Sequence, residues 1–363
     1  MPKIINVCGA RPNFMKIAPL MRAYRAHENI EPLLVHTGQH YDENMSDLFF
    51  RQLNIPEPDL NLEVGSGSHA KQTAEIMIRF EQVLLDHEPD WVLVVGDVNS
   101  TIACGLVASK LGVKLAHVEA GLRSFDRDMP EEINRVLTDA ISDLLFVSEP
   151  SGIENLRREG AAEDKIKFVG NVMIDTLRAN LEKARCSTIL KTLDLSEHGY
   201  NVATLHRPSN VDDPQVFGGI VDAFAEIQRD RPVIFPMHPR TVANLQRLGL
   251  KQRFDDLPGL RIIEPLGYLD FLQLMANANT VLTDSGGIQE ETTILGVWCL
   301  TIRENTERPV TIHEGTNLLV GTDPGKIIAA YNERKDRRPS DHHVPEKWDG
   351  RAAERIAAVL AEA

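Results

Sequence analysis

The feature of this sequence that most constrains its fold is an alternation, almost from end to end, of short β-branched runs and longer amphipathic segments. In the first half the runs are KIINVC, EPLLVHTG, DWVLVVGD, VKLAHVEA and DLLFVS. After residue 170 the pattern starts again with NVATLH, RPVIFPMH, LRIIEPL, NTVLTDS and VWCLTI, separated by helical segments such as 214–229 and 268–278. Apolar runs that alternate with helices are typical of parallel strands in βαβ units, with helices on both faces of the sheet. The sequence therefore predicts an α/β fold with two Rossmann-like parallel sheets.

The predicted domain boundary lies near residue 170. Residues 171–198 read as a helix followed by the polar stretch KTLDLSEHG, with no strand-like run between the two sheets. We therefore expect an N-terminal domain over 1–170 and a second Rossmann-like domain over 171–345, which suits a chain of 363 residues. The remaining segment, 346–363, has a helical pattern, and we expect this helix to pack back on the first domain.

Charge and composition narrow the class of partner. The chain has 39 Lys and Arg against 53 Asp and Glu, a formal net charge of −14, which argues against nucleic acid and anionic membranes. Its longest apolar runs fall far short of the ~18 residues of a membrane span, and MPKIINVCGARP lacks the pattern of a secretory signal. We expect a cytoplasmic protein whose anionic ligands bind in a locally positive pocket. The four cysteines show no metal-binding spacing and three of them lie in or beside apolar runs, which favours buried free thiols over disulfides or zinc.

The carboxyl ends of parallel strands are where such folds bind ligands, so the residues that follow each run are informative. The first run ends in GARPNFMK, where Gly9 permits a tight turn and Arg11 and Lys16 flank the start of the next helix. Two cations at a helix N-terminus favour an anion site. The alternative is an exposed Arg and Lys on an ordinary helix, and neither GxGxxG nor a Walker A pattern is present to decide.

Carboxylates follow two later runs of the first half. Asp97 in GDVNST and Glu119 in HVEAGLRS end neighbouring strands, and each is next to a glycine. Such a residue is either a helix N-cap or a functional group. In MPEEINR, Glu131 and Glu132 occupy the first turn of a helix and Arg135 lies one turn on; the acids there also complement the helix dipole without any further role.

In the second half, the segment LTDSGGIQEE has the arrangement of strand, Ser285, two glycines and helix. This arrangement presents backbone N–H groups and a hydroxyl to a phosphate at a helix N-terminus. Glu291, inside that helix, suits the two hydroxyls of a ribose, and RENTERP brings Arg308 close by. His206 and His238 follow adjacent strands in TLHRPSN and PMHPR, each close to an arginine. A lone histidine at such a position is more often structural, but two such clusters at adjacent strand ends also favour a functional site.

Taken together these motifs resemble one family, the non-hydrolysing UDP-N-acetylglucosamine 2-epimerases. The resemblance covers nearly the whole chain, in order: GARPNFMK, TGQHY, GDVNST, HVEAGLRS, MPEEINR, GNVMIDT, HRPSN, TDSGGIQEE, TERP and NLLVG. It implies a glycosyltransferase-B-like architecture of two facing domains with the active site in the cleft between them. It also implies a cytosolic homodimer that interconverts UDP-N-acetylglucosamine and UDP-N-acetylmannosamine for surface polysaccharides, an isomerase that uses no NAD and no metal.

The resemblance also assigns roles, residue by residue. Arg11 and Lys16 correspond to first-domain ligands of the sugar nucleotide. The catalytic carboxylates correspond to Asp97, Glu119 and Glu131, with Arg135 beside them. The contacts to the nucleotide diphosphate correspond to His206, which also counts among the catalytic residues, and to Ser285, Gly286, Gly287, Glu291 and Arg308. Phe271, in YLDF, corresponds to the residue beside the uracil.

The family chemistry suits these residue types. Inversion at C2 proceeds by elimination of UDP to a 2-acetamidoglucal and its re-addition, so protons move on two faces and two acid/base groups are needed. The departing diphosphate develops charge, which fixed donors such as Arg11, His206, Arg308 and the glycine amides stabilise.

The sequence departs from the family pattern at two places. Leu266 replaces a Gln that meets the uridine in some members, and Tyr41, Asp42 and Glu43 follow TGQH where some members carry a second Gln for an activating nucleotide sugar. We therefore expect hyperbolic kinetics without substrate activation.

Alternatives from other classes remain open. These are a retaining glycosyltransferase, a non-catalytic sugar-nucleotide sensor, and a hydrolysing relative that releases free N-acetylmannosamine. The form TGQHYDENMSDLFF with RSFDRDMPEE also resembles relatives that act on modified sugars such as diacetamido uronic acids.

Overall fold

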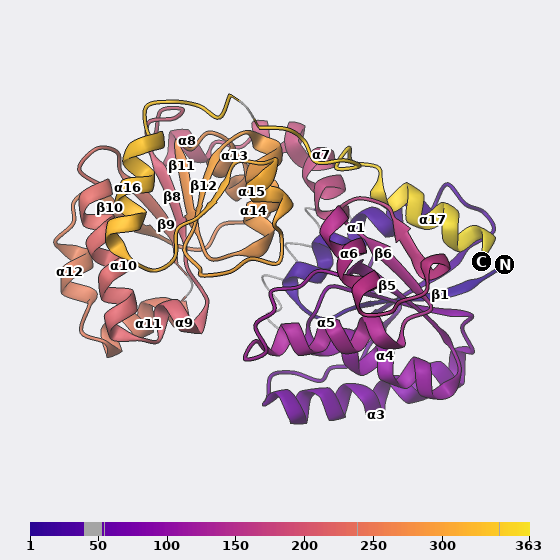
Figure 1. The fold of residues 1–363 in the computed structure, drawn as a ribbon. Helices are drawn as coiled ribbons and strands as arrows, with labels where there is room; N and C mark the ends of the chain where they lie inside the picture. Colours follow the sequence, from indigo (N-terminus) through magenta and orange to yellow (C-terminus); the bar gives the residue numbers. More distant parts are fainter. Residues whose placement is uncertain (40–52, 54, 238, 341) are drawn as a thin grey trace. The chain divides into compact units, whose positions relative to one another are not determined.

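The structure is a computed structural model that describes residues 1–39, 53, 55–237, 239–340 and 342–363, without the side chains of residues 11, 12, 239 and 240. The chain divides into two compact units, drawn in Figure 1. Unit 1 comprises residues 1–179 and 346–363, and unit 2 comprises residues 180–345. Within the described ranges, no helix combines the length and the apolar character that crossing a membrane requires.

Unit 1 is built on a seven-stranded sheet in which every pair of neighbours is parallel. Its strands are β1 (Lys3–Cys8), β2 (Glu31–His36), β3 (Leu60–Asn61), β4 (Trp91–Val95), β5 (Lys114–Ala120), β6 (Leu144–Val147) and β7 (Ile166–Phe168), in the order β3-β2-β1-β4-β5-β6-β7. This doubly wound order brings the carboxyl ends of β1, β4 and β5 next to one another.

Helices cover the sheet of unit 1 because its strands are apolar on both faces. They are α1 (Arg11–Tyr24), α3 (His69–His87), α4 (Asn99–Leu111), α5 (Pro130–Ile141), α6 (Pro150–Arg158) and α17 (Ala352–Glu362), with a 3-10 turn at Glu163–Lys165. Helices α3, α4 and α5 lie side by side in Figure 1. Ile76 and Phe80 of α3 are fully buried in the core that they form with the strands.

The C-terminal segment is part of unit 1. Helix α17 packs against α1, and the carboxylate of Asp175 accepts the N–H groups of Ala352 and Ala353 at 3.1 and 2.7 Å. Trp348 is fully buried and donates its indole N–H to the carbonyl of Ser148 at 2.9 Å. Helix α7 (Val172–Arg185), which carries Asp175, spans the division between the units at residue 179.

Unit 2 contains a six-stranded parallel sheet in the order β10-β9-β8-β11-β12-β13. The strands are β8 (Asn201–Thr204), β9 (Val233–Pro236), β10 (Leu260–Ile263), β11 (Thr280–Thr283), β12 (Trp298–Thr301) and β13 (Asn317–Leu319). The helices are α8 (Ile189–Thr192), α9 (Pro208–Val211), α10 (Pro214–Ile227), α11 (Pro239–Arg247), α12 (Lys251–Asp255), α13 (Tyr268–Ala276), α14 (Gly286–Leu295), α15 (Val310–His313) and α16 (Pro324–Arg334). Phe217, Phe224, Phe235 and Phe254 form the centre of its core.

The predicted fold class is confirmed, because each run identified in the sequence forms a parallel strand. The sequence pattern did not identify β3, β7 and β13. These strands have only two or three residues, too few to show a period, and each lies at an edge of its sheet.

Candidate active site

The first helix of unit 1 is fixed to the sheet at the point where β1 ends. Asn13 accepts the N–H groups of Gly9 and Ala10 at 3.2 and 3.1 Å, and its amide donates to the carbonyl of Val95 at the end of β4. A Cβ atom on Gly9 would lie 2.1 Å from Oγ of Ser100, so only glycine fits there. Helix α1 begins at Arg11, whose side chain lies outside the described part of the structure.

Lys16 and Glu119 form a buried ion pair at this strand edge, with 8% and 7% of their side chains exposed. A Cβ atom placed on Gly96 would lie 2.7 Å from Nζ of Lys16 and 3.4 Å from Oε2 of Glu119, so the pair packs against Gly96. Asp97 is the next residue. The structure thus brings together three of the residues predicted from separate motifs.

Arg135 of α5 joins two further carboxylates. Its guanidinium pairs with Asp97 on one side and with Glu132 on the other. The side chain of Asp97 is 29% exposed, whereas those of Arg135 and Glu132 are 5% and 2% exposed. Arg135 therefore holds the Asp97 carboxylate at the strand edge while leaving part of it accessible.

Glu132 has a structural role that its position beside Glu131 did not suggest. Its carboxylate accepts the N–H and hydroxyl of Ser124, each at 2.9 Å, and the N–H of Phe125 at 2.9 Å. Glu131, on the same first turn, is only partly buried. Removing the charge of Glu132 would therefore disturb both Arg135 and the turn at 124–125, so a Glu132 variant is not a neutral control for Glu131.

In unit 2, Asp284 organises the loop that follows β8. This fully buried carboxylate accepts the N–H groups of His206 and Arg207 and the side-chain amide of Asn210, at 2.9–3.1 Å through Oδ2. Its Oδ1 lies 2.7 Å from Nδ1 of His206. Burial raises the pKa of Asp284, but the contact with His206 and the backbone donors outweigh it and hold that pKa below its usual value. The His206 side chain remains 60% exposed, with Nε2 on the edge of the ring away from Asp284.

The N-terminus of α14 lies against Arg308. Ser285 is the N-cap residue but makes no side-chain cap to the helix, so its hydroxyl does not occupy the first backbone donors. A Cβ atom on Gly286 would lie 2.6 Å from Nη1 of Arg308, which shows how closely the guanidinium approaches this turn. Arg308 is held there by Glu290, 2.5 Å from its Nε, and by Glu307.

Two more arginines contact the carboxylate of Glu307. Arg303 makes a two-pronged pair with Glu307 at 2.9 and 3.0 Å, and Arg207 lies 3.7 Å from it. Three guanidinium groups therefore share two carboxylates at the start of α14, where the helix dipole also favours an anion. The sequence pattern located Arg308 but missed Glu290 and Glu307, because only the tertiary structure shows which acids neutralise which bases.

Glu291 lies one turn further along α14 and is 4% exposed. The hydroxyl of Tyr268 on α13 donates to its Oε1 at 3.0 Å. The predicted uracil neighbour Phe271 lies on the same helix as Tyr268, and its side chain is partly buried. Tyr268, which the sequence pattern did not single out, thus fixes the carboxylate that was predicted to meet a ribose.

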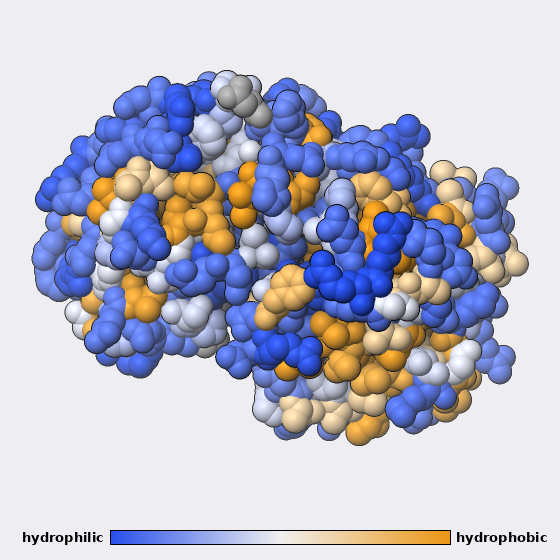
Figure 2. All heavy atoms as spheres, viewed as in Figure 1, coloured by the Kyte–Doolittle hydropathy of each residue, from blue (hydrophilic) through white to orange (hydrophobic). Residues whose placement is uncertain are grey.

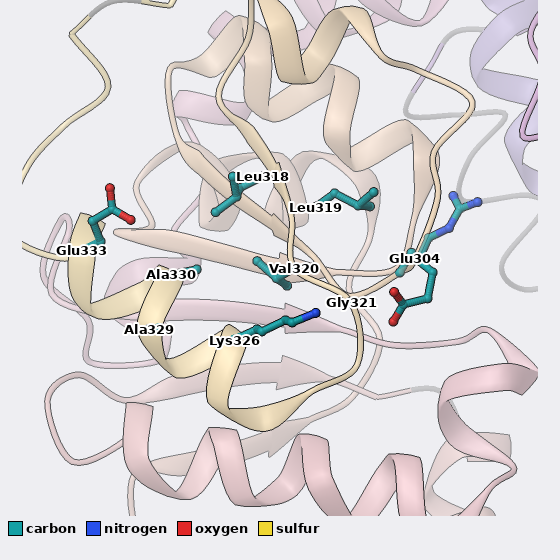
Figure 3. Close-up of a pocket in the computed structure, with 10 residues that line it drawn as sticks. Glu304, Leu318, Leu319, Val320, Gly321, Lys326, Ala329, Ala330 and Glu333 are labelled. Carbon is teal, nitrogen blue, oxygen red and sulfur yellow. The ribbon is translucent and has the colours of Figure 1, made fainter.

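A surface hollow of unit 2 contains none of the predicted site residues. It is lined by apolar groups of β13 and α16 together with Arg303, Glu304, Lys326 and Glu333 (Figure 3). The Lys326 side chain points toward Gly321 in this view, and Glu304 accepts the N–H of Thr322. Within the residues that the structure describes, no group of three or more His, Cys, Asp or Glu side chains is arranged to hold a metal ion.

Two parallel-sheet α/β units, one with ion-paired acids at its strand ends and one with an arginine-rich helix N-terminus, define a protein of the glycosyltransferase-B-like class. The family model for UDP-N-acetylglucosamine 2-epimerase matches residues 22–361. The chain therefore belongs to the UDP-N-acetylglucosamine 2-epimerase family, which confirms the resemblance seen in its motifs.

Individual relatives agree over nearly the full length. The UDP-N-acetylglucosamine 2-epimerase of Methanocaldococcus jannaschii is 44% identical over 368 residues, covering 99% of this chain and 98% of that protein. A UDP-2,3-diacetamido-2,3-dideoxy-D-glucuronate 2-epimerase of Pseudomonas aeruginosa is 42% identical over 363 residues and 99% of both chains. The crystal structure of the M. jannaschii enzyme in complex with UDP-GlcNAc and UDP has a TM-score of 0.93, at 44% identity over 99% of this chain and 100% of that one.

Proposed function

We propose that this protein catalyses the non-hydrolysing epimerisation of UDP-N-acetylglucosamine at C2, giving UDP-N-acetylmannosamine. The observation that carries the proposal is the placement of Asp97 and Glu119 at adjacent strand ends, each paired with its own cation. A glycosyltransferase or a sugar-nucleotide sensor would have no use for this set of acids. Family membership supports the same reaction.

Unit 1 supplies the groups that move protons. Elimination of UDP across C1 and C2 removes the C2 hydrogen, and addition to the opposite face returns one, so two acid/base groups are required. Asp97, Glu119 and Glu131 are the candidates. Lys16 and Arg135 hold two of these carboxylates in fixed orientations, which favours proton transfer because little reorganisation is needed at the moment of reaction.

Unit 2 supplies the groups that bind the leaving diphosphate. The start of α14, Arg308 and His206 provide donors, and Asp284 keeps the His206 ring oriented through Nδ1. Glu291, fixed by Tyr268, suits the paired hydroxyls of the ribose, and Phe271 suits the uracil. In the proposed complex Arg11 and Lys16 of unit 1 meet the sugar nucleotide as well.

A time course by NMR in D₂O tests the proposal. With UDP-N-acetylglucosamine as the substrate, we expect UDP-N-acetylmannosamine to appear with deuterium at C2 and with the UDP linkage intact. Release of free N-acetylmannosamine with UDP would instead identify a hydrolysing enzyme. Epimerisation without deuterium at C2 would exclude the elimination route.

A second substrate deserves the same experiment because a diacetamido-glucuronate epimerase is nearly as similar to this chain as an N-acetylglucosamine epimerase. The two nucleotide sugars share the UDP group and the 2-acetamido group, so they pose the same chemistry at C2. Parallel time courses with both compounds would rank them by kcat/KM. We expect the N-acetylglucosamine compound to be preferred.

Hydrogen exchange tests where the nucleotide binds. We expect UDP alone to protect residues 284–291 more than residues 9–16, because the diphosphate donors of unit 2 do not need unit 1 to be in place. Greater protection of 9–16 would contradict the assignment of the nucleotide to unit 2.

We propose a homodimer formed through the outer face of unit 1. Large apolar side chains are exposed on this face, namely Ile78 and Leu85 of α3, Leu111 of α4, and Ile133 and Leu137 of α5, at 41–66%. Figure 2 shows apolar atoms gathered over these helices. Light scattering of the purified protein should give twice the 40.5 kDa mass, and Ile78→Glu with Leu85→Glu should give a monomer.

We also place the enzyme in the cytoplasm, in a pathway that supplies surface polysaccharides. Cys8, Cys104 and Cys299 are buried free thiols, as expected in a reducing compartment. The expectation of hyperbolic kinetics depends on Tyr41, Asp42 and Glu43, which lie outside the described residues. It stays a prediction, and rate curves against substrate concentration would test it.

A further inference from the structure

Behind the strand edge of unit 1 lies a chain of ionisable side chains to which the motifs above assign no role. It runs from His117 of β5 through Asp139 of α5 and Arg123 to Glu159. The side chains of the first three are 0–2% exposed, and that of Glu159 is 39% exposed. We call these four residues the His117–Asp139 network. Charges buried to this degree are costly unless each is paired.

The carboxylate of Asp139 accepts hydrogen bonds from three donor groups. Nδ1 of His117 lies 2.6 Å from Oδ1, while the N–H of Gly121 and Nη2 of Arg123 lie 3.0 and 2.7 Å from Oδ2. Burial raises the pKa of Asp139, but His117 and Arg123 outweigh it and hold that pKa below its usual value. Asp139 is therefore a carboxylate and can only accept.

Both ring nitrogens of His117 face hydrogen-bond acceptors. Its Nε2 lies 2.8 Å from the carbonyl oxygen of Gly96, which can only accept a hydrogen bond. Its Nδ1 faces the Asp139 carboxylate. The His117 ring thus connects Gly96, which precedes Asp97, to Asp139. The Asp139 carboxylate in turn accepts the N–H of Gly121.

The two backbone segments tied in this way have unusual conformations. Glu119 has a φ of 76°, in the left-handed region that is unfavourable for a residue with a side chain, and the β5–β6 register shifts between Val118 and Ala120. Gly96 and Gly121 also have positive φ, 66° and 81°. Left-handed backbone at a non-glycine residue is energetically unfavourable and persists only where its surroundings enforce it.

Further contacts hold Gly121 in place. A Cβ atom there would lie 2.3 Å from the carbonyl oxygen of Gly152, so the backbone segments at Gly121 and Gly152 are in contact. Asn155 of α6 donates to the carbonyl of Gly121 at 2.9 Å, while Asp139 receives its N–H. The N–H and the carbonyl of Gly121 are therefore both hydrogen-bonded to side chains rather than to a neighbouring strand.

We propose that His117 and Asp139 are positioning residues, which hold the backbone on either side of the two carboxylates Asp97 and Glu119 in the geometry that proton transfer at C2 requires. The inference rests on the proposed function. His117 acts on Asp97 through the carbonyl of Gly96, and Asp139 acts on Glu119 through the N–H of Gly121. Neither residue needs to touch the substrate.

Two substitutions of His117 separate these connections. Glutamine places an amide N–H₂ near the position of Nε2, so His117→Gln can still donate to Gly96. Asparagine places it near Nδ1, so His117→Asn can still donate to Asp139 but gives up Gly96. We expect His117→Asn to lower kcat about 10- to 100-fold, the scale of a misplaced catalytic group, and His117→Gln to retain several-fold more. KM should change little, because unit 2 binds the nucleotide.

Asp143→Asn is the matched control. Asp143 accepts the N–H of Leu115 at 2.9 Å, at the opposite end of the same strand β5. Replacing this charge-assisted hydrogen bond by a weaker neutral one should lower the melting temperature without changing kcat per folded molecule, where the folded fraction is read from the circular-dichroism melting curve. Substrate deuterated at C2 adds a second readout: the isotope effect on kcat should rise in His117→Asn, because proton transfer becomes more limiting, and stay as in the wild type in Asp143→Asn.

The outcomes distinguish this inference from the proposed function. A wild-type protein that does not exchange the C2 hydrogen overturns the proposed function and the positioning role with it. An active wild type with unchanged kcat and isotope effect in His117→Asn overturns the positioning role alone. Equal losses in His117→Asn and Asp143→Asn would also overturn it, because they would show a general effect of destabilising β5.

Discussion

The amine of Lys16, on the second turn of α1, pairs with the carboxylate of Glu119, 103 residues further along the chain. Both side chains are buried, and the backbone of Glu119 is left-handed at φ 76°. The pair packs against Gly96. One ion pair thus links three strand ends, β1 through its following helix, β4 and β5, at the edge where the substrate is proposed to react.

Replacing Lys16 should affect both stability and turnover. Lys16→Met leaves a buried carboxylate without its cation, which typically costs about 3–5 kcal/mol of unfolding free energy. The protonated form of Glu119 is then favoured, so we expect kcat to fall by ~10²-fold. Lys110→Met, on the exposed end of α4, is the control. A Lys16→Met protein with normal kcat would show that the charge of Glu119 is irrelevant to the reaction.

Amide substitutions test the proposed acids directly. We expect Asp97→Asn and Glu131→Gln each to lower kcat by ~10²-fold or more, the usual scale for a lost acid or base. Both side chains are partly exposed, so their melting temperatures should change little. Glu154→Gln, an exposed acid on α6, should behave as the wild type in both measurements.

Glu132→Gln should behave differently from Glu131→Gln. It removes a buried charge that three donors and Arg135 contact, so we expect its main effect to be a lower melting temperature. A melting temperature equal to that of the wild type would contradict the structural role assigned to Glu132.

A single methyl group should weaken nucleotide binding. In Gly286→Ala the added Cβ would lie 2.6 Å from Nη1 of Arg308, so the guanidinium must move. Loss of one charged hydrogen bond is worth about 1.5–3 kcal/mol, so the Kd for UDP should rise by roughly 10- to 100-fold in calorimetry. Gly219→Ala is the matched control, because its nearest new neighbour would be 3.6 Å away. Equal affinity of the two variants would place the diphosphate away from α14.

Asp175 should make the docking of the C-terminal helix sensitive to pH. Burial raises its pKa from 3.8 to about 6, although the N–H groups of Ala353 and Ala352 act in the opposite direction. A carboxyl group whose folded pKa is raised contributes stability that is complete below about pH 4 and is lost as the pH rises toward about 6. Over that window the loss is about 3 kcal/mol.

Hydrogen exchange of residues 352–362, corrected for intrinsic rates, measures this effect. We expect the opening free energy in the wild type to fall between pH 4 and pH 6.5, and the fall to disappear in Asp175→Asn. Helix α10, far along the chain in unit 2, should show no difference between the two proteins. The same slope in both proteins would show that Asp175 does not titrate in this range.

The repeating pattern of apolar runs and amphipathic segments was enough to predict two parallel-sheet α/β units. Strands such as KIINVC and VLVV are long enough for burial to impose a pattern on the sequence, whereas β3, β7 and β13 are not. The motifs also singled out Asp97, Glu119 and His206 at or just after strand ends, and Lys16, Arg135 and Arg308 in the helices and loop that follow strands. Ligand chemistry requires particular residue types directly after particular strands, and such requirements are local in sequence.

Only the tertiary structure decided how these residues are paired. Lys16 with Glu119, Arg135 with Asp97 and Glu132, and His206 with Asp284 are contacts between distant segments, and nothing in the spacing of the motifs distinguishes one acid from its neighbour. The different roles of Glu131 and Glu132, and the His117–Asp139 network behind the strand edge, arise for the same reason. Whether a buried charge acts on a substrate or stabilises the backbone depends on which groups the fold places within hydrogen-bonding distance of it.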